Sequence, residues 1–96
     1  MNELAVTSKF QKLLKKKNKE SSQRYVINKI STAIESLRNS ENPESLGEKK
    51  KGKLRECYAY ELTKSSRLLY QVERREEKIR IVLLRVCSHK QTYDID

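Results

Sequence analysis

The sequence predicts a single α+β domain over residues 1–96, with two N-terminal helices packed on a three- to four-stranded, mainly antiparallel sheet. Apolar residues recur at helical spacing between positions 26 and 37, and from Leu54 onward the pattern changes to that of strands. The predicted strands are joined by links of about four residues, whereas a parallel return needs a crossover of a dozen or more. A chain of 96 residues has room for one hydrophobic core.

The N-terminal segment predicts a short strand followed by a short helix. Glu3–Val6 is a weak strand signal, and Thr7 or Ser8 can cap the helix with a hydroxyl. The apolar residues of this helix are Phe10, Leu13 and Leu14. Lysines at positions 15–19 suit the negative end of the helix dipole, so the helix is expected to end there.

The second predicted helix is the clearest element of the chain. Ser21 or Ser22 can cap it, and its opposite side is polar. Its apolar stripe consists of Val26, Ile27, Ile30, Ala33, Ile34 and Leu37. Such a stripe must pack on an apolar surface, which a sheet can supply.

A basic loop and three strands complete the predicted domain. Residues 38–53 hold both glycines, the only proline and four lysines between positions 49 and 53, which is typical of a mobile loop. The strands are predicted at residues 54–62, 67–73 and 78–87. Both alternating sets of the last strand are largely apolar, so we expect it in the sheet core.

The net charge favours a polyanionic partner such as nucleic acid or an acidic protein. The formal charge is +9 and the isoelectric point is about 9.7. Residues 1–53 carry 13 basic and 6 acidic side chains, a net charge of +7, so the basic surface belongs mostly to the first half. The charge alone does not select an activity.

Targeting and metal-binding patterns are missing from the sequence. No signal peptide or membrane-length apolar run follows Met1, so a cytoplasmic protein with no membrane partner is expected. Cys57 and Cys87 are isolated, and the chain has one histidine, so we expect buried thiols and no zinc site or cofactor.

Three side chains near strand ends can carry chemistry. His89 follows the most apolar strand, where a rigid scaffold commonly presents catalytic groups, and Tyr93 comes four residues later. Arg67 opens the middle strand. Taken without further context, Arg67 is better explained as a strand-end arginine that covers the sheet edge.

The segment from Ser66 to Val72, followed by Ile81 to His89 with Tyr93 behind it, resembles the second half of RelE/ParE-superfamily toxins. The upstream helices, the loop at residues 42–46 and the start of the first long strand also follow the order of that superfamily. The resemblance therefore covers nearly the whole chain. Its most specific pieces are the Arg-Leu-x-Tyr and His-x-x-x-Tyr patterns.

This resemblance implies a RelE-like, microbial RNase-like fold and the toxin of a type II toxin-antitoxin system. The implied activity is that of an mRNA interferase, a metal-independent and ribosome-dependent endoribonuclease that cleaves mRNA in the A site by attack of the 2′-hydroxyl. The implied partners are mRNA, the ribosome and a cognate antitoxin, which forms a hetero-oligomer with the toxin. Arg67 would grip the scissile phosphate, His89 would be the catalytic histidine, and Tyr93 would stack on a base or orient the sugar.

The resemblance leaves the general base open. RelE has lysines at positions that correspond here to Ala59 and Glu61, so a lysine base is not expected. Glu44 resembles the loop glutamate of YoeB-like members, and the sequence does not decide between Glu44 and Glu61. The residues expected to contact RNA phosphates are Lys49, Lys50, Lys51, Lys53 and Arg55. Solubility is the alternative explanation of these charges.

The ParE branch of the superfamily offers a different function on the same fold, inhibition of DNA gyrase by binding and without nuclease activity. His89 with Tyr93 favours the nuclease, because a gyrase binder needs no proton donor there. An inactive RNA-binding or antitoxin-binding module is a third alternative. We expect the antitoxin to lay an acidic or amphipathic helix over the basic face, covering Arg67 and His89.

Overall fold

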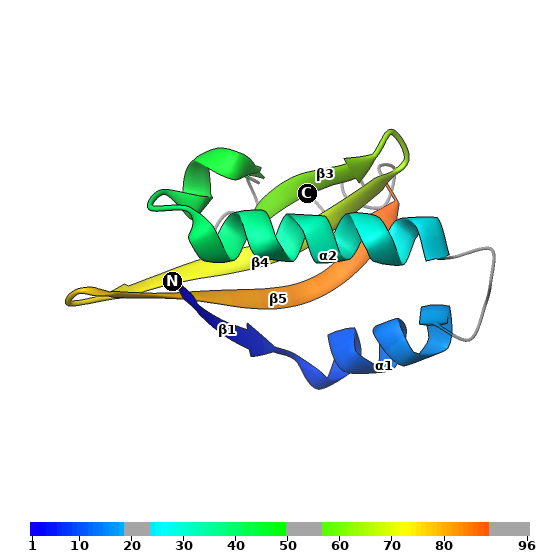
Figure 1. Ribbon diagram of the computed structural model, residues 1–96, viewed down its shortest axis with the longest axis horizontal. Coiled ribbons are helices and arrows are strands. Elements are labelled where there is room, and N and C mark those ends of the chain that lie inside the picture. Colours follow the sequence, from blue (N-terminus) through cyan, green and yellow to red (C-terminus); the bar gives the residue numbers. More distant parts are fainter. Residues whose placement is uncertain (19–23, 50–56, 89–96) are drawn as a thin grey trace.

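A computed structural model describes residues 1–18, 24–49 and 57–88 of the protein. Its elements are β1 (Glu3–Val6), α1 (Ser8–Asn18), α2 (Arg24–Asn39), the short 3-10 helix η2 (Pro43–Leu46), β2 (Glu48–Lys49), β3 (Tyr58–Thr63), β4 (Ser66–Arg75) and β5 (Lys78–Ser88). Figure 1 shows α2 lying across the sheet, with α1 beyond it on the side of β1. The described residues contain no helix that is long and apolar enough to cross a membrane.

The sheet has five strands in the order β1-β5-β4-β3-β2. The antiparallel pairing of β3 with β4 and of β4 with β5 confirms the predicted hairpins. The prediction of three to four strands was too low, because Glu48–Lys49 forms a two-residue strand on β3 within the predicted loop. Two charged residues show no apolar alternation, so this strand leaves no signal in the sequence.

Both helices pack on one face of the sheet. The buried core on that face consists of Phe10, Ile30, Ala33, Leu37, Leu62, Leu68, Tyr70, Ile81 and Leu83. The apolar stripe predicted for the second helix is confirmed, since three of its members are fully buried there and two others pack against the core. Packing of this apolar stripe on the sheet therefore determines which face of α2 is buried.

Thr7 provides the cap of α1 that the sequence predicted. The Phe10 backbone N–H donates to Thr7 Oγ1 at 3.1 Å, and the same hydroxyl donates to the Leu84 carbonyl at 3.0 Å. This side chain satisfies an orphan donor of the first helical turn. It also fastens the start of α1 to β5.

Side chains on the sheet's second face point away from the helices. Because side chains alternate along a strand, Ala59 and Leu69 face the side opposite to Leu68 and Tyr70. Ala59, Leu69 and Cys87 form a second buried cluster there. Both cysteines are buried, as expected. Arg67 shares the second face with this cluster, which sets where a site can form.

Candidate functional site

Arg67 lies at the first hairpin turn with its guanidinium held in a fixed position. Nη1 donates to the carbonyls of Thr63 at 2.8 Å and Ser66 at 3.1 Å. Nη2 lies 3.3 Å from Oε1 of Glu61. The Arg67 side chain is only 15% exposed, whereas that of Glu61 is 66% exposed. One nitrogen of a preorganised arginine is thus turned toward an accessible carboxylate.

A guanidinium in this position suits an anionic oxygen. Arginine binds carboxylates and phosphates with the same planar fork. The Glu61 carboxylate occupies the place at Nη2 that a phosphate oxygen could take, and its exposure allows it to move aside. The arrangement can therefore bind a phosphate and keep a carboxylate beside it.

The pairing of Arg67 with Glu61 depends on an irregularity in the hairpin. Thr63 pairs with Ser66, but the register shifts before Glu61, which then pairs with Arg67. A regular ladder would have placed Leu62 opposite Arg67. The shift brings the acidic and the basic side chain together.

The end of β5 lies beside the same turn. Ser88 pairs with Ser66, and Cys87 pairs with Arg67. The predicted His89 and Tyr93 follow in the sequence and lie outside the described residues. Of the predicted catalytic residues, Arg67 lies at this turn, and its carboxylate partner there is Glu61.

Glu44 is not grouped with Arg67 in the structure, contrary to the expectation from the sequence. It lies in η2 and forms a two-point ion pair with Arg74, with Arg74 Nε 2.6 Å from Oε2 and Nη2 2.8 Å from Oε1. Arg74 and Arg67 are seven positions apart on β4, about 23 Å along a strand. The hydrogen bonds from Arg74 also lower the pKa of Glu44, which makes its carboxylate a poor proton acceptor.

The Glu44–Arg74 ion pair predicts a pH-dependent contribution to stability. Because the folded-state pKa of Glu44 lies below its ordinary value of 4.5, the stabilisation is full above that value. It is lost as the pH falls through the depressed folded-state pKa. We expect Glu44→Gln to flatten the fall in urea midpoint between about pH 5 and pH 3.

The matched control for this prediction is Glu35→Gln, which changes an exposed glutamate of α2. It should keep the acid dependence of the wild-type protein. A Glu44→Gln profile that overlays the wild-type profile would show that the ion pair contributes nothing in solution.

The loop that carries η2 is anchored to the sheet by Tyr70. The buried Tyr70 hydroxyl donates to the Pro43 carbonyl at 2.7 Å, and burial raises the pKa of Tyr70, which keeps the donor protonated. A Cβ on Gly47 would lie 2.6 Å from that hydroxyl, so the close approach requires glycine. Of the residues predicted to bind RNA, Lys49 follows this anchored loop and is exposed. Lys50, Lys51, Lys53 and Arg55 lie outside the described residues.

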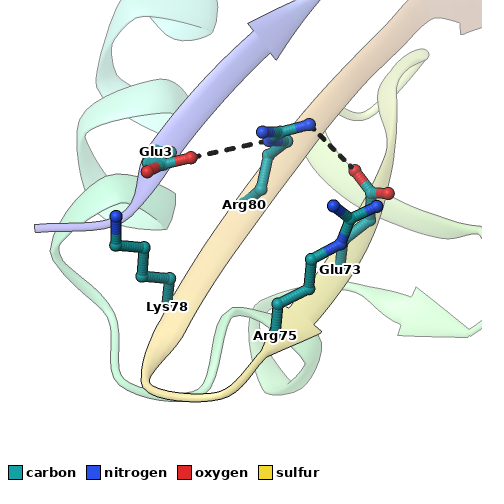
Figure 2. Close-up of a pocket in the computed structure, with 5 residues that line it drawn as sticks. All are labelled: Glu3, Glu73, Arg75, Lys78 and Arg80. Atoms are coloured by element: carbon teal, nitrogen blue, oxygen red, sulfur yellow. Dashed lines mark ion pairs between the residues drawn. The ribbon is translucent and has the colours of Figure 1, made fainter.

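A charged cavity of about 210 Å³ lies near the turn between β4 and β5. Figure 2 shows Arg80 between Glu3 and Glu73, with Arg75 and Lys78 beside them. Arg80 lies 3.5 Å from Glu3 and 3.9 Å from Glu73. These exposed pairs contribute about 0–1 kcal/mol each. The cavity is remote from Arg67, because Glu73 lies six positions farther along β4.

The described residues contain no group of three or more histidine, cysteine, aspartate or glutamate side chains that could hold a metal ion. The polar groups gathered at Arg67 are instead a guanidinium, a carboxylate and two backbone carbonyls. Such a set is suited to binding an anion and to accepting a proton.

Comparison with known proteins identifies relatives of this chain. Residues 4–95 match a family model described as the ParE-like toxin of type II bacterial toxin-antitoxin systems. Among curated protein sequences, none matches the chain significantly.

Solved structures share the fold. The chain is similar to a YoeB/ParE toxin from Agrobacterium tumefaciens, with a TM-score of 0.74 and 19% identity over 91% of this chain and 98% of that one. A copper-bound mutant toxin from Helicobacter pylori gives a TM-score of 0.62 and 20% identity over 95% and 98% of the two chains. A conserved hypothetical protein from the same organism gives 0.61 and 19% over 94% and 97%.

Proposed function

The chain belongs to the family of ParE-like toxins of type II bacterial toxin-antitoxin systems, and we propose that within this family it is a ribosome-dependent endoribonuclease that cleaves mRNA in the A site. Its antitoxin partner follows from the family. The observation that carries the nuclease proposal is the geometry of Arg67, a mostly buried side chain whose guanidinium is fixed by two carbonyls beside an exposed carboxylate. A protein that only binds a partner does not need a preoriented arginine that can bind phosphate next to a carboxylate that can accept a proton.

In the proposed reaction the 2′-oxygen attacks the adjacent phosphorus and the bond to the 5′-oxygen breaks, which leaves a 2′,3′-cyclic phosphate and a 5′-hydroxyl. Arg67 binds the phosphate and offsets the charge that develops on it. Glu61 takes the proton of the 2′-hydroxyl, in place of the distant Glu44. His89 gives a proton to the leaving oxygen, and Tyr93 orients the reacting nucleotide. As written, the reaction uses no metal ion.

Phosphate binding would also change the partner of Arg67. In the structure Nη2 faces Glu61, so an incoming phosphate competes with that carboxylate for the guanidinium. The displaced Glu61 carboxylate would then be available to the 2′-hydroxyl beside the bound phosphate.

The test is primer-extension mapping of an mRNA in a reconstituted translation system, with wild type and His89→Ala compared. Cuts at A-site codons that require ribosomes, and that fall by about 100-fold or more in the variant, are the expected result. Wild-type protein that makes no cuts while it still arrests growth would contradict the nuclease proposal.

The alternative is a ParE-like inhibitor of DNA gyrase, which is considered because the matching family is described as ParE-like toxins. A supercoiling assay with purified gyrase separates it from the nuclease. The nuclease proposal expects no inhibition, whereas inhibition that survives His89→Ala would support gyrase binding.

We also propose that the antitoxin covers Arg67 and His89 with an acidic or amphipathic segment. The net charge of +9 favours an acidic partner. Adding the antitoxin should therefore abolish cleavage, and a tight complex that still cuts mRNA would rule this placement out.

A further inference from the structure

An open groove lies beside the candidate site, where the start of α2 passes the β3–β4 turn. Its volume is about 630 Å³, and its lining residues are Tyr25, Lys29, Glu61, Leu62, Thr63, Lys64 and Ser65. Glu61 belongs both to this groove and to the ion pair with Arg67 at 3.3 Å. Glu61 is thus shared by the groove and the proposed phosphate site.

Tyr25 presents an aromatic ring to solvent in this groove. Its exposed fraction is 61%. It is the one aromatic residue among the exposed large apolar side chains in the described part of the chain. Lys29, one helical turn later, places its Nζ 5.4 Å from the ring centroid. Because this contact already restricts the Tyr25 ring, stacking a base on the ring costs little additional side-chain entropy.

The charges of the groove suit a strand of nucleic acid. Lys29 and the exposed Lys64 are its cations, and Glu61, its one acidic lining residue, faces Arg67. Single-stranded nucleic acid is bound by this combination of cations for the phosphates and an aromatic ring on which a base stacks. An apolar helix of a protein partner would gain little from a groove lined mainly by polar side chains.

We propose that this groove binds an unpaired nucleotide of the RNA next to the cleaved phosphate, with its base stacked on Tyr25 and its phosphates contacted by Lys29 and Lys64. The inference rests on the proposed nuclease function and deepens it by adding a substrate subsite. It concerns binding of single-stranded RNA, which can be measured without cleavage.

The first experiment measures the affinity of purified protein for a fluorescent 12-nucleotide 2′-O-methyl RNA, which lacks the attacking hydroxyl. Tyr25→Ala should weaken binding about 5- to 100-fold, the range for loss of one base–aromatic stack. Tyr25→Phe keeps the ring and should bind like wild type. Lys64→Ala should weaken binding and reduce its salt dependence, whereas Lys12→Ala, on the exposed side of α1, is the matched control for loss of one lysine.

A duplex of the same sequence distinguishes stacking from general attraction to phosphates. Bases in a duplex are already stacked, so Tyr25→Ala should leave duplex affinity unchanged. An equal loss on both RNAs would overturn the stacking proposal, and unchanged affinity for the single strand would also overturn it and assign the groove to a protein partner. Circular dichroism melts of each variant check that the exposed substitution leaves the fold intact.

The same variants separate this inference from the nuclease proposal. If Tyr25→Ala loses single-strand affinity but wild type never cuts mRNA on ribosomes, the groove proposal stands and the nuclease proposal fails. If wild type cuts mRNA and Tyr25→Ala binds and cuts equally well, the nuclease proposal stands and the groove proposal fails.

Discussion

Replacing Arg67 with alanine should lower the rate of mRNA cleavage by about 100- to 1,000-fold, the usual cost of removing a group that stabilises charge in the transition state. The side chain is 15% exposed and its Nη1 is fixed by two carbonyls, so its Nη2 is already oriented before substrate binds. Arg67→Lys keeps the charge but loses the planar fork, and should recover only part of the rate. Single-turnover cleavage on programmed ribosomes measures both effects.

The matched control is Arg74→Ala, which removes another arginine of the same strand. Arg74 lies seven positions from Arg67 along β4 and binds Glu44. Loss of Arg74 should therefore leave the cleavage rate close to that of wild type. Equal rates for the two alanine variants would remove Arg67 from the proposed mechanism. Thermal melts establish whether each variant is folded. They therefore distinguish loss of the phosphate-binding side chain from disorder of the turn.

Phe10→Ala should lower the free energy of unfolding by about 3–5 kcal/mol. Among the α1 side chains that the structure describes, Phe10 is the one in the buried core, with 0% of its surface exposed. Small domains are stable by about 5–15 kcal/mol in total, so this single change removes a large part of the margin. Urea denaturation at pH 7 measures the shift in midpoint.

The neighbouring Leu13 provides the comparison. It is partly exposed and does not belong to the core cluster, so Leu13→Ala should cost clearly less than Phe10→Ala. Similar losses for the two variants would mean that α1 packs differently in solution. The loss in free energy of unfolding for Phe10→Leu should lie between those for Phe10→Ala and Leu13→Ala, because leucine keeps most of the apolar volume of Phe10.

The sequence carried enough information for the helix α2 and the two hairpins. Periodic apolar residues such as Ile30, Ala33 and Leu37 fix the face of a helix, and short polar links force antiparallel neighbours. The parallel pairing of β1 with β5 could not be predicted, because its partners are about 77 residues apart and no turn links them. Such long-range pairing is set by how the whole core assembles.

The candidate site was only partly predictable for a related reason. The sequence singled out Arg67 but left Glu44 and Glu61 as alternatives, because the distance of either from Arg67 depends on strand register. A one-residue shift in the hairpin places Glu61 opposite Arg67. The ion pair with Arg74 places Glu44 elsewhere. Tyr25 gave no signal, because a single aromatic residue near a helix start has no periodic partner.

The position of β5 in the sheet bears on how the protein is made. Among the described strands β5 comes last in the chain, yet it lies between β1 and β4. During translation β1 therefore has no partner strand until residues 78–88 have emerged. The start of β4 beside Arg67 lacks its β5 neighbour for the same time. Because Arg67 lacks its β5 neighbour and His89 has not yet been added at that stage, the proposed site is completed only late in synthesis.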